Sequence, residues 1–282
     1  QSPMALNMAL VKNLPYDPRR DLTPIAGISL VNHILVVKAS SPIKTLPEFL
    51  ARAKQAPGKV TVGYATSLVQ MQVFHINRVA GVELLPVPYK GTPAALTDVL
   101  GDNLVATFLD PGSALPHIKS GQLRALGVTS GKRNPLTPDI PAIAEHLAGY
   151  DFSVWTGMVG PAGMRPEVVS RIHAAVDHAI RQKDVVDKFA LAATVPYLAG
   201  PEQLKGVIES DAAKWIQLAR EAGITSNQGP AVATRPVAGE DARRIALATA
   251  QRAIVLGHFS QWKPSPHDRG YTLKSAVARV RS

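Results

Sequence analysis

The sequence predicts an α/β protein, because short β-rich runs alternate with helical patterns and Gly, Pro, Ser or Asp marks each change. Between residues 59 and 159 the periodic patterns of apolar residues predict about five strands interleaved with four helices. This order favours a mainly parallel, doubly wound sheet, since parallel strands need a crossover helix between them. Aromatic residues form only 5% of the chain, which favours helices packed on a sheet over an aromatic-rich sandwich.

The first elements of this alternation begin at a helix start signal. The Thr45 hydroxyl and the Glu48 carboxylate form a capping box for a helix that ends at Pro57-Gly58. The elements that follow are a strand at 59–65, a helix at 69–80, a strand at 83–88, a helix opened by Thr92 and Pro93, and a strand at 103–109.

The later elements are a short helix at 112–120, a strand at 123–129, a capped helix at 139–147 and a final strand at 152–159. After residues 160–163 the pattern becomes helical alone, with apolar residues at helical spacing in 166–181 and 201–220. Two amphipathic helices need a sheet to cover, and residues 1–37 offer only one or two strands. The sequence therefore predicts a further lobe of which part is missing.

The composition excludes several classes of protein. The 282 residues are 46% hydrophobic, which is ample for a core, and the chain has no cysteine, so disulfide scaffolds, thiolate metal sites and cysteine nucleophiles are excluded. No stretch approaches the ~20 apolar residues of a membrane span. The N-terminus shows no export signal, and because Gln1 is not a start methionine the sequence does not decide localisation.

The net charge of +10 is unevenly distributed. Residues 227–282 carry nine basic and three acidic side chains, so the rest of the chain is only mildly basic. We therefore expect no nucleic-acid partner. Residues 226–282, rich in Gln, Pro, Gly, Arg and Ser, are predicted to be a loosely ordered basic tail, with a partner-binding helix at 241–256 as the alternative.

Three consecutive strand-to-helix crossings carry residues suited to binding an anion. In open α/β sheets, ligands bind at the carboxyl ends of strands, where helix N-termini present unpaired N–H groups. Hydroxyls can add hydrogen bonds to a carboxylate, although at any one position an ordinary N-cap is the more common role. Asp110 could orient a donor, bind a substrate amine or face solvent. The candidates from the three loops are Thr66 and Ser67, Thr92, and Asp110 with Ser113.

The sequence contains none of four common catalytic or nucleotide-binding motifs. The sequence lacks G-x-S-x-G, G-x-x-x-x-G-K-[ST], G-x-G-x-x-G and H-E-x-x-H. The eight histidines are scattered, and the nearest pair, His173 and His178, lies on different faces of a helix. We therefore expect no catalytic residue, no metal site and no cofactor. A hydrolase hidden in the α/β body is the less favoured alternative.

Several motifs, in unbroken order from Asn7 to Thr225, resemble one family. The segments are LPYDP at 14–18, DLTPI at 21–25, PGKV at 57–60, VPYKG at 87–91, PHIKSG at 116–121, LRAL at 123–126 and PAG at 161–163. Together they resemble the Bug/TctC family, the extracytoplasmic solute-binding receptors of tripartite tricarboxylate transporters.

The resemblance implies a two-lobed, periplasmic-binding-protein-like Venus flytrap fold. Its lobes close over a small carboxylate, such as a di- or tricarboxylate, an amino acid or an aromatic acid, and deliver it to an integral-membrane permease. It implies a periplasmic location, a first lobe at 1–31 and 155–225, and a second lobe at 32–154. We expect a monomer. Carried over by position, the ligand loop falls at 63–67. A second ligand-facing crossing is formed by Tyr89 to Ala94, which includes Gly91. Asp110 corresponds to the aspartate that follows the next strand.

Three departures from the family pattern are visible. The ligand loop reads GYATSLVQ and has fewer glycines than is usual, the opening strand with its Pro-x-Gly-Gly loop is absent, and residues from Ser226 onward have no family counterpart. The first lobe is therefore expected to be incomplete. A truncated, non-functional receptor fragment is the alternative function.

Overall fold

The computed structural model describes residues 3–10, 14 and 16–221. These residues all belong to one compact unit of the chain, residues 1–230. The predicted basic tail at 226–282, with its alternative helix at 241–256, lies outside the described residues.

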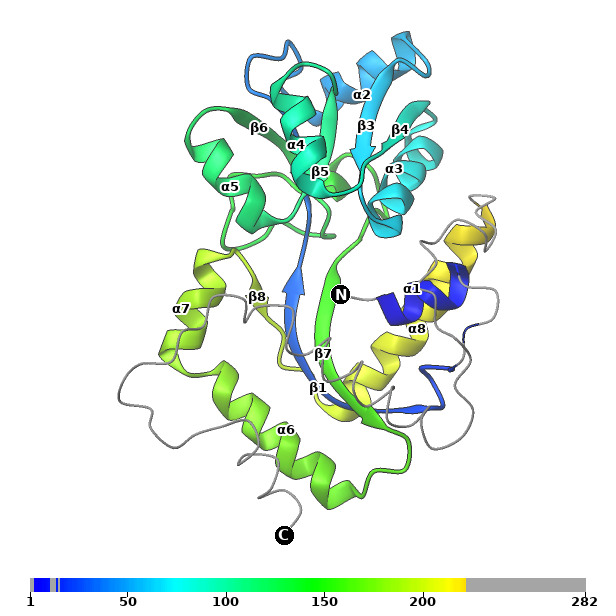
Figure 1. Cartoon of the computed structure of the whole chain (residues 1–282), viewed down its shortest axis with the longest axis vertical. Coiled ribbons are helices and arrows are strands. Elements are labelled where there is room, and N and C mark those ends of the chain that lie inside the picture. The colour runs from blue at the N-terminus through cyan, green and yellow to red at the C-terminus, as the bar shows by residue number, and fades with distance from the viewer. Residues whose placement is uncertain (1–2, 11–13, 15, 222–282) are drawn as a thin grey trace. The chain divides into compact units, whose positions relative to one another are not determined.

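One of the two sheets has five strands in the order β4-β3-β5-β2-β6 (Figure 1). β3 runs parallel to β4 and β5, whereas β2 is antiparallel to both β5 and β6. Four strands therefore share one direction, as the alternation predicted, and the reversed β2 lies between two of them. The strands are β2 (Ile34–Lys38), β3 (Val60–Tyr64), β4 (Leu84–Pro88), β5 (Ala106–Leu109) and β6 (Leu123–Val128).

The crossover helices of this sheet begin and end close to their predicted positions. They are α2 (Leu46–Gln55), α3 (Ser67–Ala80), α4 (Thr92–Leu100) and α5 (Pro111–Lys119). Thr45 caps α2 by accepting the Glu48 N–H at 3.3 Å. A capping box would have the Glu48 carboxylate accept the N–H of the N-cap, Thr45. It instead accepts the N–H of the preceding residue, Lys44, at 2.6 Å.

The predicted helix at 139–147 is wrong, because only the 3₁₀ turn η1 (Ile143–Glu145) forms there. Pro141 lacks an N–H and disfavours a helical conformation in the residue before it. The chain instead stays extended beside β6, where Val128 donates to the Pro141 carbonyl at 2.8 Å and Ala142 forms a parallel bridge with Val128.

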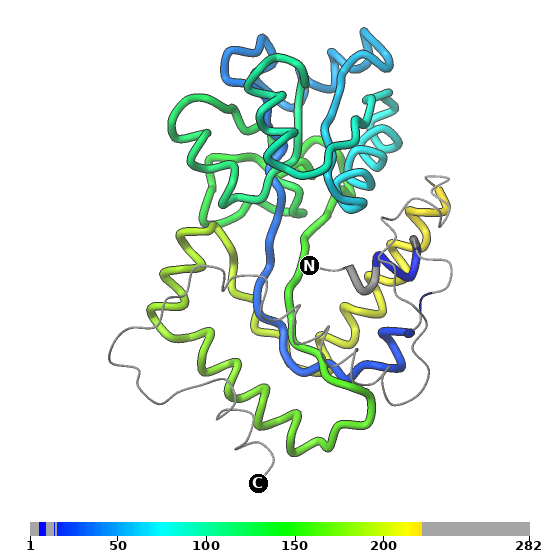
Figure 2. The backbone as a smooth tube through the Cα atoms, viewed as in Figure 1, coloured from blue at the N-terminus to red at the C-terminus, as the bar shows by residue number. Residues whose placement is uncertain are grey.

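The second sheet has three antiparallel strands in the order β7-β1-β8. Its strands are β1 (Leu22–Val31), β7 (Val154–Pro161) and β8 (Val195–Pro196). The long β1 and β7 run side by side away from the five-stranded sheet (Figure 2). The strand predicted at 152–159 thus belongs to this sheet, and its assignment to the parallel sheet is wrong. Its register with β1 depends on residues more than a hundred positions earlier.

Four helices accompany the three-stranded sheet. They are α1 (Pro3–Leu10), α6 (Pro166–Ile180), α7 (Lys183–Leu191) and α8 (Pro201–Glu221). The predicted helices at 166–181 and 201–220 are confirmed as α6 and α8, and both contact β1. The prediction of helices alone after residue 163 is wrong, because β8 pairs with β1.

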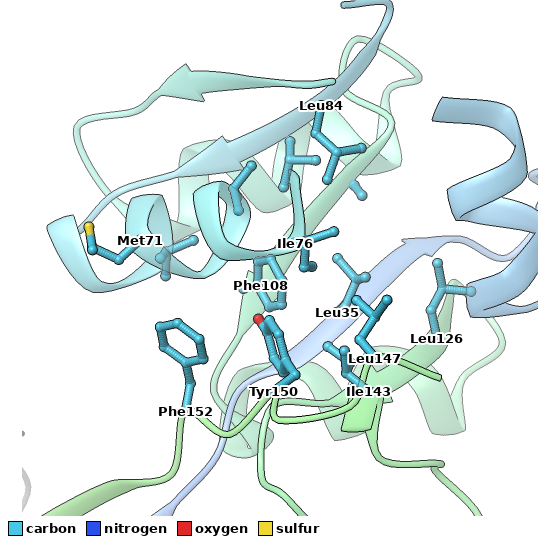
Figure 3. Close-up of a cluster of buried hydrophobic side chains, with 14 of the residues drawn as sticks. Leu35, Met71, Ile76, Leu84, Phe108, Leu126, Ile143, Leu147, Tyr150 and Phe152 are labelled. Carbon is cyan, nitrogen blue, oxygen red and sulfur yellow. The ribbon is translucent and has the colours of Figure 1, made fainter. Parts of the chain in front are cut away.

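The main core lies in the five-stranded sheet and its helices (Figure 3), and α1 and α8 also contribute side chains to it. Phe49, Ile76 and Tyr150 are fully buried in this cluster, together with strand residues such as Leu35. On the other face of the sheet, Ile34, Val36 and Leu109 pack against α4 and α5. Both faces of the sheet are therefore covered, as a sheet with crossover helices on each side requires.

Candidate functional site

The predicted ligand loops lie at one edge of the five-stranded sheet. β3, β4 and β5 are parallel, so their carboxyl ends, Tyr64, Pro88 and Leu109, meet at that edge. The Tyr89 N–H donates to the Tyr64 carbonyl at 2.8 Å, which ties the first two loops together. The strand register therefore gathers all three candidate crossings at the sheet edge where α/β proteins bind ligands.

The first crossing opens α3. Thr66 is the N-cap, and its hydroxyl accepts the Val69 N–H at 3.3 Å. Thr66 is exposed and Ser67, the first helical residue, is half-buried. A helix start leaves its first N–H groups without intrahelical acceptors, so Ser67 offers an N–H and a hydroxyl close together. These two donors suit the two oxygens of one carboxylate.

The second crossing opens α4, and its N-cap is Gly91 rather than a hydroxyl residue. Gly91 has no side chain to occupy the first N–H groups of the helix. Thr92, which follows it, is half-buried, and Ala94 is exposed with its N–H 3.2 Å from the Gly91 carbonyl. The N–H of Thr92 is therefore the best-placed donor of this helix start.

Tyr89 has a structural contact within the same loop. Its hydroxyl donates to the Asp98 carboxylate at 2.7 Å, and this hydrogen bond, with burial, raises the pKa of Tyr89 to about 12. Its ring lies over Gly63, where an added Cβ would meet Tyr89 at 3.2 Å and Leu104 at 2.5 Å. Tyr89 thus holds α4 against β3, and its hydroxyl is already engaged.

The third crossing opens α5 with an acid as its cap. Asp110 accepts the Ser113 N–H at 3.0 Å and the Ser113 hydroxyl at 2.7 Å. The carboxylate therefore occupies the helix start that would otherwise attract an anion. Asp110 remains exposed, which suits it to a hydroxyl or amine of a ligand more than to a carboxylate.

Two residues at this edge were missed by the sequence reasoning. His33 precedes β2 and lies beside Leu109 and Asp110, because Ile34 pairs with Leu109. Burial lowers the pKa of His33, while its hydrogen bond to Gln72 Oε1 and the charge of Asp110 act in the opposite direction. Thr129 follows β6 at the same edge and is fully buried. Only the strand pairing reveals them, since neither forms a motif.

Two helix starts at this edge present groups that suit an anion. The starts of α3 and α4 supply N–H groups and partial positive charge, and Ser67 adds a hydroxyl. Within residues 16–221 and the described part of α1, no three His, Asp or Glu side chains gather as metal ligands would. None of the helices in that part of the chain is long and apolar enough to span a bilayer.

Comparison with known proteins gives the family. Residues 2–224 match the family model described as the tripartite tricarboxylate transporter family receptor. The protein BugT of Bordetella pertussis is 30% identical over 230 residues, covering 79% of this chain and 69% of BugT. A protein from a Pseudomonas strain, encoded in the tcbD-tcbE intergenic region, is 32% identical over 76% of this chain and 65% of its own length. The chain thus spans about two thirds of these relatives.

Solved structures agree with the sequence comparison. The R. palustris protein Rpa4515, solved with adipate, is 26% identical with a TM-score of 0.69, over 78% of this chain and 76% of its own. The periplasmic binding protein BugD is 25% identical with a TM-score of 0.67 over the same shares. These likenesses confirm the predicted two-lobed, periplasmic-binding-protein-like fold. With the family model matching most of its length, the chain belongs to the tripartite tricarboxylate transporter receptor family.

Proposed function

We propose that this chain is the ligand-binding body of a periplasmic receptor for a small carboxylate. The observation that carries the proposal is the pairing of two helix starts, α3 and α4, at the carboxyl ends of the adjacent parallel strands β3 and β4. Two such N-termini side by side favour a carboxylate over a neutral or cationic ligand. Rpa4515, a relative in structure, was solved with adipate, which supports a dicarboxylate.

Each candidate residue has a role in this proposal. The Ser67 and Thr92 N–H groups bind the two carboxylate oxygens, Ser67 adds its hydroxyl, and Thr66 fixes the loop as N-cap. Tyr89 positions the second loop through Asp98. Gly91 and Ala94 leave room for the ligand at the start of α4. Asp110 and Ser113 bind the other, polar end of the ligand.

We further propose that the first lobe comprises residues 1–31 and 155–225 and the second lobe residues 32–154. The change of sheet between β1 and β2, and again before β7, supports these limits. In this proposal the ligand binds between the lobes, the protein acts as a monomer without catalysis, and a membrane permease receives the ligand. The name of the matched family supports the permease partner.

Isothermal titration with adipate, malate, citrate, aspartate and benzoate tests the proposal. A saturable signal with at least one of these acids, and none with their amides, supports it. The absence of binding to every acid by a folded chain would overturn it and favour the non-functional fragment.

The substitution Thr92→Pro tests the proposed donor directly. Proline is tolerated at the first helical position and removes one N–H, and the extended Gly91 suits a following proline. A hydrogen bond to a charged group contributes about 1.5–3 kcal/mol, so we expect about 10- to 100-fold weaker binding. Thr92→Val separates the hydroxyl from the N–H. Lys183→Pro, at the first position of α7 beside the other sheet, is the matched control and should leave affinity unchanged.

A further inference from the structure

A buried polar network lies where the chain passes between the two sheets. Asn32, Thr129 and Asn134 are only 5%, 0% and 3% exposed. Buried polar side chains are costly unless they are hydrogen-bonded, so each is expected to have a defined partner. Asn32 donates to the Ser130 hydroxyl at 3.3 Å and accepts from Asn134 at 3.1 Å. The network therefore begins on the first crossing, between β1 and β2.

Thr129 joins the two crossings of the chain. The His33 N–H donates to the Thr129 hydroxyl and the Thr129 N–H to the His33 carbonyl, both at 2.9 Å. The Phe152 N–H, on the second crossing before β7, donates to the Thr129 carbonyl at 2.7 Å. These bonds lie within the crossings themselves, so they can move with a hinge there.

Asn134 makes a contact of a different kind. Its amide nitrogen donates to Asn32 Oδ1 at 3.1 Å and to the Ala193 carbonyl at 2.9 Å, which uses both hydrogens. Its Oδ1 accepts the Leu136 N–H at 2.9 Å. Ala193 lies between α7 and β8, beside the three-stranded sheet and far along the chain from either crossing. The Asn134 amide thus connects the loop after β6 to the other sheet.

Ala193 is held in a conformation that alanine seldom adopts. Its φ is +45°, in the left-handed region that is unfavourable for an L-residue with a Cβ, and the residue is 1% exposed. The Thr194 N–H closes the end of α7 on the Phe189 carbonyl at 2.9 Å. The Ala193 carbonyl is thereby directed to Asn134 by a turn that packing holds in place.

We propose that Asn134 is a latch between the lobes, which helps to hold them in one relative orientation in the ligand-free protein. It acts beside the two covalent crossings, the Arg78–Glu221 ion pair and the hydrogen bond from Lys214 to the Asp151 carbonyl. A hydrogen bond is lost when donor and acceptor separate beyond about 3.5 Å. A rotation about the crossings that carries Ala193 farther than this from Asn134 breaks the bond, because Ala193 lies outside the hinge. The buried amide then loses its acceptor, which shifts the ratio of two lobe orientations by about tenfold.

The test is a distance measurement between spin labels at Lys54→Cys in α2 and Arg171→Cys in α6. Both sites are exposed, and the chain has no other cysteine to react. Asn134→Asp keeps the acceptor for Leu136 and the side-chain size but removes both donors. In the ligand-free protein we expect its distance distribution to shift or broaden relative to the parent.

Asn77→Asp is the matched control. Asn77 donates to the Leu84 carbonyl at 3.0 Å and accepts the Leu84 N–H at 2.8 Å, so it makes an equivalent bridge within one lobe. It should lower the melting temperature without changing the label distance. An unchanged distribution in Asn134→Asp, or an equal change in Asn77→Asp, would overturn the latch.

Asn134→Ser is the second variant, since serine can close the same turn but is too short to reach Ala193. It should reproduce the shift without adding charge. If neither Asn134 variant gives a cooperative thermal transition, Asn134 is required for folding and the latch is rejected. Because the distances are measured without ligand, failure of the proposed carboxylate binding leaves this test intact.

Discussion

The two sheets differ in how well they are packed. The five-stranded sheet is covered on both faces, and eleven of the twelve largest fully buried side chains lie in it, in its helices or in the segment 150–152. The three-stranded sheet has two small clusters, one around Ile25 and Val169 and one around Trp155 and Leu204. α7 buries none of its side chains among the described elements. The scaffold of the candidate site therefore holds most of the large buried side chains, with α8 adding Trp215 and Leu218 to its main cluster, whereas the other lobe has only small clusters of its own.

The largest effect is expected from Phe49→Ala. Phe49 is fully buried on α2 against the five-stranded sheet, and such a truncation lowers the free energy of unfolding by about 3–5 kcal/mol. Ile172→Ala on the half-buried face of α6 should cost less than half as much. Urea unfolding of both variants checks the difference. Equal losses would mean that the two lobes are packed alike.

Gly63→Ala should have the next largest effect. An added Cβ would lie 2.5 Å from the Leu104 side chain and 3.2 Å from Ala95, so the buried Leu104 side chain or β3 must shift, at a cost of about 1–3 kcal/mol. Gly91→Ala is the control, because its Cβ would meet only Pro93 at 3.6 Å and its backbone is extended. Thermal unfolding should separate the two variants, and a Gly63→Ala protein as stable as Gly91→Ala would refute the close approach.

A smaller effect is expected from acid. Burial, with the charges of Lys214 and Arg78, lowers the pKa of His75 below its ordinary value of about 6.5. The unfolded chain therefore binds the proton more readily, so stability is full above pH ~6.5 and falls as the pH drops below it. His75→Phe keeps the aromatic contacts with Tyr150 and Phe152 and should weaken this dependence.

Urea midpoints measured from pH 8 to pH 5 check this prediction. The parent and the His75→Phe variant should differ in the slope below pH ~6.5 and not above it, since both carry an uncharged ring there. Parallel curves through the whole range would show that His75 does not carry the acid sensitivity. His33, whose pKa burial also lowers, should contribute to the slope that remains.

The smallest effect is expected at Leu191. Its side chain is 84% exposed at the end of α7, so Leu191→Ser should change the free energy of unfolding by no more than about 0.5 kcal/mol. Leu84→Ser, on β4, is the contrasting variant because Leu84 is 2% exposed. A loss at Leu191 near that at Leu84 would mean that α7 is covered in solution.

Much of the second lobe could be predicted because its signals are local. Thr45 and Thr66 cap the helices that follow them, and the bounds of α2 to α5 follow from such caps and from apolar periodicity. Strand partners are not local information. The reversed direction of β2 and the pairing of β7 with β1 depend on residues far along the chain, so periodicity alone misassigned the strand at 152–159.

The candidate site was predictable to the same extent. Thr66, Ser67 and Asp110 stand out as polar residues after strands, and the structure gathers their loops at one edge. Whether a polar group is free is a matter of tertiary contacts. The Tyr89 hydroxyl is engaged by Asp98 on α4 and the His33 ring by Gln72 on α3. Asn134 gave no signal at all, since its partner lies at Ala193.

The order of the two sheets along the chain has a consequence for folding kinetics. β1 precedes and β7 follows all the strands of the five-stranded sheet, and Val31 pairs with Val154. Joining such distant segments of an unfolded chain carries a large entropic penalty. Once the inner sheet has folded, Thr129 holds His33 and Phe152 together, so the next residues emerge already aligned. We therefore expect the five-stranded sheet to fold first and the three-stranded sheet to assemble on it.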